Sequence, residues 1–244
     1  MGLGGYSGRP HSDLGGRPWE PQSWSRYAYA LNNSLKYVDP TGLYEWAANC
    51  TSGDKQCEEN RQKFRDALTT TRTAAEQLKE GSKERKKLEA VLSKFGAEGE
   101  KNKVKIAFGP AGGYPAEQST SFFSRTNTIT FDMNMIGNML SRNEQLNADY
   151  KPTIGFAEIV THEGSHMLDR FFFGNPVNRE GSYRTEFNAF ESQSYVPMSL
   201  NQYSHYGLWN PSSAEVDREA LRQKAVQKTA EDHVNQMWGP PKKP

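Results

Sequence analysis

Apolar residues recur at helical spacing along most of the chain after residue 54. Between residues 54 and 95 they lie among Lys, Arg, Glu and Gln, as on one face of an amphipathic helix, and Gly81 divides this range into two helices. Pro152 can open a third long helix, which runs to about Phe172. Two further helices are predicted over residues 183–196 and 213–238.

Strand patterns occupy the middle of the chain. Residues 103–108 alternate between polar and apolar side chains, which predicts a strand, and residues 119–124 and 127–132 predict a hairpin or two adjacent strands. A short helix is expected over residues 134–141. These elements predict an α+β fold, with a helical N-terminal part, a small antiparallel or mixed sheet and C-terminal helices.

Composition excludes several classes of partner. The 30 Lys and Arg balance 29 Asp and Glu over 244 residues, so charge gives no reason to expect nucleic acid or an anionic membrane as the main partner. No apolar run approaches the roughly 18 residues needed for insertion across a bilayer, and the N-terminus lacks the order of a secretory signal peptide. The spacing of Cys50 and Cys57 favours free thiols or an incidental disulfide over a metal pair.

Residues 1–43 form a separate compositional region, rich in Gly, Pro, Ser, Asn and aromatic residues. They contain the segments WSRYAYALNN, beginning at Trp24, and YVDPTGL, ending at Leu43. In their order these segments resemble the end of the RHS repeat-associated core, where an Asp-Pro-x-Gly-Leu motif closes a large β-shell and a variable toxin module follows. Ser34 departs from the family, which usually has proline after the paired asparagines, and almost none of the shell precedes the motif.

This resemblance implies a domain organisation. Residues 1–43 would be a remnant of the RHS core end, residues 44–238 a toxin domain, and residues 239–244 a disordered tail. The family cleaves itself after the motif leucine, here Leu43, and whether that cleavage occurs without the shell stays open.

The strongest chemical signal is the segment His162-Glu163-Gly164-Ser165-His166. Two histidines four residues apart project from one face of a helix, where their imidazoles can bind one Zn²⁺. Glu163 then lies beside the metal and reaches its water as a general base. Apolar residues on both sides of the segment indicate that this helix is buried, as a rigid metal site requires.

A catalytic zinc site needs a third protein ligand. The metzincin pattern fails, because Asp169 and Phe172 stand where its Gly and His should be. Glu186 is the better candidate, and this arrangement resembles the gluzincins, zincin-like peptidases in which a Glu from a second helix completes the site. Gluzincins often place an Asp four residues beyond that Glu to orient a histidine. Phe190 occupies that position here, so the groups around the ligands must differ.

Further residues have supporting roles in this prediction. Glu191 is the rival third ligand or a group of the second shell, and Asp169 is expected to accept a hydrogen bond from a ligand imidazole. Glu158 either does the same or faces solvent. A donor must also share the developing oxyanion charge, and His205 is the first candidate, ahead of four downstream tyrosines: Tyr183, Tyr195, Tyr203 and Tyr206.

The sequence therefore predicts a zinc metallopeptidase that hydrolyses a protein or peptide substrate. If residues 127–132 form a sheet edge rather than a core strand, an extended peptide could pair along them. The RHS resemblance implies a toxin secreted or delivered by a bacterial secretion system into a competitor or host cell, with an immunity protein as partner. A zinc amidase acting on peptidoglycan peptides and a non-catalytic orphan module stay open as alternatives.

Overall fold

The computed structural model describes residues 43–48, 53–99, 103–121, 126–173, 178–214 and 217–240, without the side chains of Leu43 and of residues 170–173. The chain divides into two units, Met1–Asp39 and Pro40–Pro244, and every described residue belongs to the second. The segments that resemble the RHS core end thus lie outside the described residues, apart from the backbone of Leu43. Residues 241–244 of the predicted tail also lie outside them.

Every range that the sequence predicted to be helical contains helices in the structure. They are α1 (Lys55–Gln77), α2 (Lys83–Phe95), α3 (Met133–Leu146), α4 (Pro152–Phe173), α5 (Arg179–Leu200) and α6 (Arg218–Trp238). Side chains cap several N-termini, because the first backbone N–H groups of a helix have no partner within it. Asp54 accepts from two such groups of α1 and Ser82 from one of α2. Pro152 opens α4, as expected.

The strands form one mixed sheet of the order β2-β1-β3-β5-β4. They are β1 (Leu43–Trp46), β2 (Ala97–Glu98), β3 (Val104–Phe108), β4 (Ala116–Thr120) and β5 (Asn127–Phe131). The pairs β1–β2, β1–β3 and β3–β5 are parallel, and β4 runs antiparallel to β5. The fold is therefore α+β with a mixed sheet. Strands β4 and β5 are adjacent, as predicted, but β4 begins at Ala116 and shares only residues 119 and 120 with the predicted range of 119–124.

The possible placement of residues 127–132 at a sheet edge is wrong. Strand β5 lies between β3 and β4, because its Ile129 pairs in register with Ile106 of β3 and its other side pairs with β4. The edge on this side of the sheet is β4, whose residues are largely exposed. Strand β5 supplies core side chains instead, with Ile129 and Phe131 fully buried.

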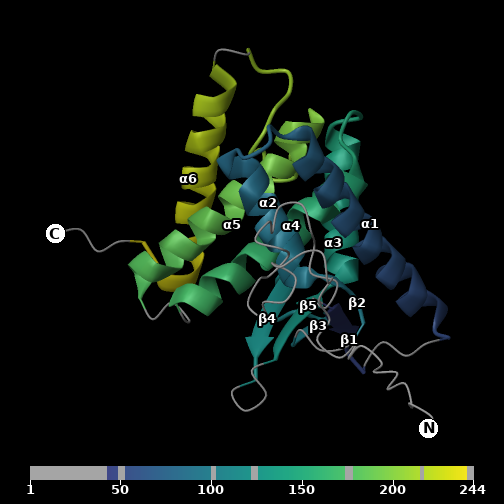
Figure 1. The fold of residues 1–244 in the computed structure, drawn as a ribbon. Helices are drawn as coiled ribbons and strands as arrows, with labels where there is room; N and C mark the ends of the chain where they lie inside the picture. Colours follow the sequence, from purple (N-terminus) through teal and green to yellow (C-terminus); the bar gives the residue numbers. More distant parts are fainter. Residues whose placement is uncertain are drawn as a thin grey trace, which may run out of the picture. The chain divides into compact units, whose positions relative to one another are not determined.

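The hydrophobic core lies between the sheet and the long helices, with α4 in its middle. One cluster joins Phe64 of α1, Val91 of α2, Ile106 of β3, Phe131 of β5 and Val160 of α4. Helix α4 packs against α1, α2, α3 and α5 and also touches β4. Figure 1 draws these helices above the strands, with α6 in yellow beside α5. The central helix is thus held on several sides, which fixes the directions of its side chains.

Helix α5 is unusual because polar side chains are buried along its length. Seven of them are buried: Ser182, Thr185, Glu186, Glu191, Ser192, Gln193 and Ser194. The helix packs against α1, α2, α4 and α6. A smaller apolar cluster of Phe190, Leu208, Val226 and Ala230 joins it to α6. Buried polar groups are destabilising unless they are hydrogen-bonded or bind a ligand, so this helix is the place to look for a site.

Two further features are the polarity of the described helices and the covalent state of Cys57. None of the described helices combines the length and the apolar character that a membrane span requires. Cys57 in α1 is buried and disulfide-bonded. The sequence contains one other cysteine, Cys50, which lies outside the described residues.

Gly164 lets α2 approach α4 closely, which gives a prediction about stability. A Cβ at Gly164 would lie 2.5 Å from Val91 Cγ1 and 2.6 Å from Phe95 Cε2. We expect Gly164→Ala to lower the free energy of unfolding by about 1–3 kcal/mol, because α2 must shift to admit the methyl group. Chemical denaturation followed by circular dichroism measures this change.

Gly137→Ala is the matched control. Gly137 lies in α3, and a Cβ there would have no neighbouring atom within 4 Å. Alanine should stabilise the protein at this position by about 0.5–1 kcal/mol, because it restricts the unfolded chain. Equal stabilities of the two variants would contradict the close helix packing at Gly164.

Candidate functional site

Helix α4 presents His162 and His166 on one face, one helical turn apart. Their Nε2 atoms lie 3.0 Å from each other. The two rings meet nearly at right angles, with an interplanar angle of 80° and centroids 4.7 Å apart. Both nitrogens therefore face one point in space, which follows from the spacing of four residues on a helix.

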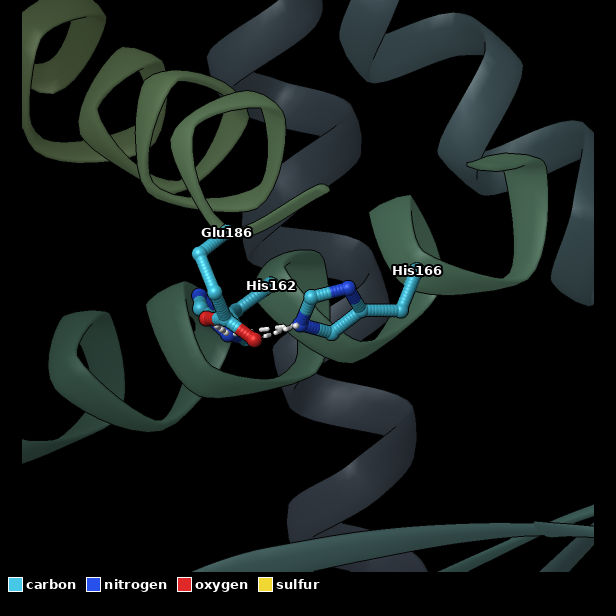
Figure 2. Close-up of side chains that lie close together, drawn as sticks. All are labelled: His162, His166 and Glu186. Carbon is cyan, nitrogen blue, oxygen red and sulfur yellow. Dashed lines mark hydrogen bonds and ion pairs between the residues drawn. The ribbon is translucent and has the colours of Figure 1, made fainter. Parts of the chain in front are cut away.

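Glu186 reaches the same point from α5. Its Oε2 lies 3.5 Å from His162 Nε2, and its Oε1 lies 3.4 Å from His166 Nε2. Figure 2 shows the carboxylate directed at the two rings from the neighbouring helix. Burial opposes ionisation of Glu186, but the nearby His166 and His162 outweigh it and lower its pKa to about 2. An ionised, buried carboxylate between two imidazoles results.

These three side chains could hold a metal ion. One ligand atom from each of them lies within 4.8 Å of the others, and all three residues are largely buried. Glu186 Oε2 is itself buried without a hydrogen-bond donor among the described residues. The nearest donors to this oxygen in the described part of the chain are the imidazole nitrogens of His162 and His233, at 3.5 and 4.0 Å, so a cation held between the three side chains would complete its contacts.

Gln193 orients the ring of His162. The Nδ1 of His162 donates to Gln193 Oε1 at 3.1 Å, which leaves Nε2 as the lone-pair nitrogen that faces Glu186. Phe190 packs edge-on against the same ring, with centroids 4.5 Å apart. Phe190 thus packs on the imidazole of His162, and Gln193 supplies the hydrogen bond that orients it. The sequence analysis missed Gln193. Its position two helical turns beyond Glu186, on the same face of α5, is the signal that could have indicated it.

Glu158 acts on the site through Gln193 and does not face solvent. It accepts from Gln193 Nε2 at 3.3 Å, from Ser204 Oγ at 2.6 Å and from the backbone N–H of His205 at 2.8 Å. Burial raises the pKa of Glu158 to about 8, although these three donors favour the ionised form. Glu158 therefore connects the ligand-orienting amide to the segment that follows α5.

The three side chains open into a cavity of about 330 Å³. Glu163 lines it beside the two histidines, and residues 114–118 of the β4 region form another wall. The side-chain amide of Gln118 donates to the backbone carbonyl of Glu163, so β4 is fastened to α4 at the site. Helix α6 contributes His233 and Met237 to the lining.

The structure does not bring His205 to the cavity. Its ring lies 2.6 Å from Asn143 Nδ2 and is absent from the cavity lining, and burial lowers its pKa to about 4. The neighbouring Tyr206 lines the cavity instead, together with His233, whose Nε2 lies 4.0 Å from Glu186 Oε2. The sequence contains no local signal for His233, because the packing of α6 on α5 brings it there.

Glu191 and Asp169 have other partners than the sequence suggested. Glu191 forms ion pairs with Lys83 and Lys87 of α2 and lies outside the possible metal-binding group of His162, His166 and Glu186. Asp169 lines the cavity but accepts from Asn188 rather than from a ligand imidazole.

Compared with known proteins, the chain matches no family model, no curated protein sequence and no solved structure.

Proposed function

We propose that this chain is a zinc-dependent peptidase with a zincin-like fold. The observation that supports it is the convergence of two imidazole nitrogens and one carboxylate on a single point. The two Nε2 atoms lie 3.0 Å apart, and each lies 3.4–3.5 Å from a different oxygen of the Glu186 carboxylate, distances close to the edge of about 3.3 Å of a tetrahedral zinc site with bonds of about 2.0–2.1 Å. One ligand atom from each of the three residues lies within 4.8 Å of the others. Two histidines with one Glu is also a ligand set of catalytic zinc, which leaves a position for water.

A zinc ion held by His162, His166 and Glu186 would acidify a bound water and polarise a substrate carbonyl. Glu163 lines the cavity next to the first ligand and serves as the base that takes the proton of the attacking water, then passes it to the leaving amine. Tyr206 and His233 are the donors to the developing oxyanion, in place of His205. Burial and nearby carboxylates raise the pKa of Tyr206 to about 12, which keeps its hydroxyl proton available for donation.

The sheet edge beside the cavity supports a peptide substrate. Among the described strands, β4 pairs only with β5, and its residues Ala116, Glu117 and Gln118 line the cavity. The main-chain groups on its outer side can pair with an extended peptide, as in recognition by strand addition. The hydrogen bond from Gln118 to Glu163 holds this edge next to the proposed base.

The biological setting follows from the RHS resemblance and is part of the proposal. The domain after residue 43 acts as a bacterial toxin or effector on a protein of a target cell, reached through a secretion system. A small immunity protein that covers the cavity is the expected partner. Strand β1 begins at Leu43 and is an inner strand of the sheet, so the domain uses residues directly after the Asp-Pro-Thr-Gly motif.

Metal dependence tests the proposed function. We expect the full chain to bind one zinc per molecule by elemental analysis, to cleave denatured casein, to lose cleavage after chelation and to regain it with one equivalent of zinc. Mass spectrometry of the fragments identifies the cleaved bonds. A chain that binds no zinc when zinc is supplied would overturn the proposal and leave a non-catalytic module. A zinc-bound chain that cleaves peptidoglycan peptides but not casein would favour the amidase.

A further inference from the structure

Among the described residues that line the cavity, four are acidic, three are histidines, and none is a lysine or arginine. The acidic residues are Glu117, Glu163, Asp169 and Glu186. A divalent ion would offset two of these four negative charges. Because Glu163 and Glu186 have roles in the proposed reaction, Asp169 and Glu117 are the carboxylates left to interact with a substrate.

Asp169 is the more informative of the two, because it is buried and forms no ion pair with a cationic side chain among the described residues. Its residue is only 8% exposed. The one hydrogen bond to its carboxylate among the described residues comes from the neutral amide of Asn188, at 3.3 and 3.5 Å from the two oxygens. Burial raises the pKa of Asp169, and Lys87 and Arg184 offset this only in part from a distance. The carboxylate therefore retains acceptor capacity toward the cavity.

Helix α5, which forms the wall of the cavity next to Asp169, also offers hydrogen-bond acceptors. Thr185 and Ser182 of α5 line it and are buried, and Thr185 lies one turn before the Asn188 that contacts Asp169. Thr185 Oγ1 donates its proton to the carbonyl of Ser182, and Ser182 Oγ receives the indole N–H of Trp238. The lone pairs of Thr185 Oγ1 are left for a donor supplied by a ligand.

Aromatic rings line the same cavity and are partly exposed. Tyr114 is 46% and Tyr206 41% exposed, and both line the cavity. The faces of such rings attract ammonium and guanidinium groups. Excess acceptors, excess negative charge and exposed tyrosines thus point to the same class of ligand, a cationic hydrogen-bond donor.

We propose that Asp169, with Ser182 and Thr185 beside it, binds the lysine or arginine side chain of a substrate peptide, so that the enzyme cleaves near basic residues. This inference rests on the proposed peptidase function for its substrate. The basic side chain donates to Asp169 and to Thr185 Oγ1, while the peptide backbone pairs with β4. Asp169 is therefore a specificity-determining residue rather than a support for the metal ligands.

Binding without cleavage tests this separately from catalysis. The full-length Glu163→Gln protein, loaded with zinc, is titrated calorimetrically with acetyl-Ala-Ala-Arg-Ala-Ala-amide and with the same peptide carrying citrulline, the uncharged isostere of arginine. We expect the arginine peptide to bind about tenfold more tightly or better, as for one desolvated charge-assisted contact. Adding Asp169→Asn should bring the ratio of the two affinities close to one, and Asp169→Glu should restore part of it.

Glu117→Gln is the matched control, since it removes the other unassigned carboxylate of the cavity. The arginine peptide should still bind about tenfold more tightly than the citrulline peptide in this variant. Equal binding of the two peptides, no binding of either, a ratio that survives Asp169→Asn, or a ratio lost with Glu117→Gln instead would each overturn the role of Asp169. Failure of the proposed function has a different signature, because wild-type protein would then cleave neither peptide whatever the affinities of the Glu163→Gln protein.

Discussion

Glu163→Gln should lower peptide hydrolysis by about 10³-fold while the protein keeps its zinc, because glutamine cannot accept the proton of the attacking water. The substitution preserves the size of the side chain, and Glu163 is not one of the three residues whose atoms converge on the possible metal position. The loss should therefore be in kcat rather than in metal content. Cleavage of a fluorogenic peptide, with zinc measured on the same sample, checks both parts.

Glu180→Gln provides the control for this prediction. Glu180 is exposed in the first turn of α5 and is absent from the cavity lining, so its replacement should change neither zinc content nor hydrolysis. A Glu163→Gln protein that retained more than about a tenth of wild-type activity would contradict the general-base role, since such a base contributes at least about 10²-fold.

The helices and the first two metal-binding candidates could be predicted because their signals are local. Helical periodicity fixes which side chains share a face within a few residues, and this is enough to place His162 and His166 together. The apolar residues around them predicted burial, and α4 is buried in the core. Glu186 required only the further assumption that the next helix folds back on α4, and α4 and α5 pack against each other.

The sheet order was less accessible, because it depends on pairing between distant segments. Strand β1 has four residues and β2 has two, which is too short for an alternation pattern to stand out. Nothing in residues 127–132 shows that β3 covers one side of them. The edge strand proposed to bind the peptide is β4, because β5 is covered on its other side by the parallel strand β3.

The groups around the possible metal position were predicted least well. His205 and Tyr206 are adjacent in the sequence, yet only Tyr206 lines the cavity. The segment leaves α5 through the left-handed residue Asn201 and is held by hydrogen bonds to Glu158, and these contacts decide which side chain faces inward. Asp169 illustrates a different error, because its helical spacing to His166 was suitable but its partner is Asn188.

Glu186 and Glu191 lie on one helix, five positions apart in the sequence, but only the replacement of Glu186 by alanine should remove the zinc. Glu186→Ala removes one of three proposed zinc ligands, so we expect zinc affinity to fall at least about 100-fold and the purified protein to contain almost no zinc. Glu191→Ala leaves the three ligands in place, and zinc content should remain at one per chain. Elemental analysis of the two purified variants measures this directly.

Glu191→Ala should also lower the stability of the protein. Glu191 is 4% exposed and accepts from Lys83 and Lys87, with the Lys83 Nζ at 2.8 Å, so it ties α5 to α2. Burial opposes ionisation of Glu191, but the two lysines outweigh it and hold its pKa at about 2. Glu191→Ala should therefore lower the free energy of unfolding by about 1–3 kcal/mol at neutral pH, because two lysines lose their buried partner. The contribution of the Glu191 carboxylate to stability is present above its unfolded-state pKa and is lost as the pH falls toward 2. The difference in stability from wild type should therefore shrink in acid.

Zinc lost from Glu191→Ala but retained by Glu186→Ala would exchange the two roles and place the third ligand at Glu191.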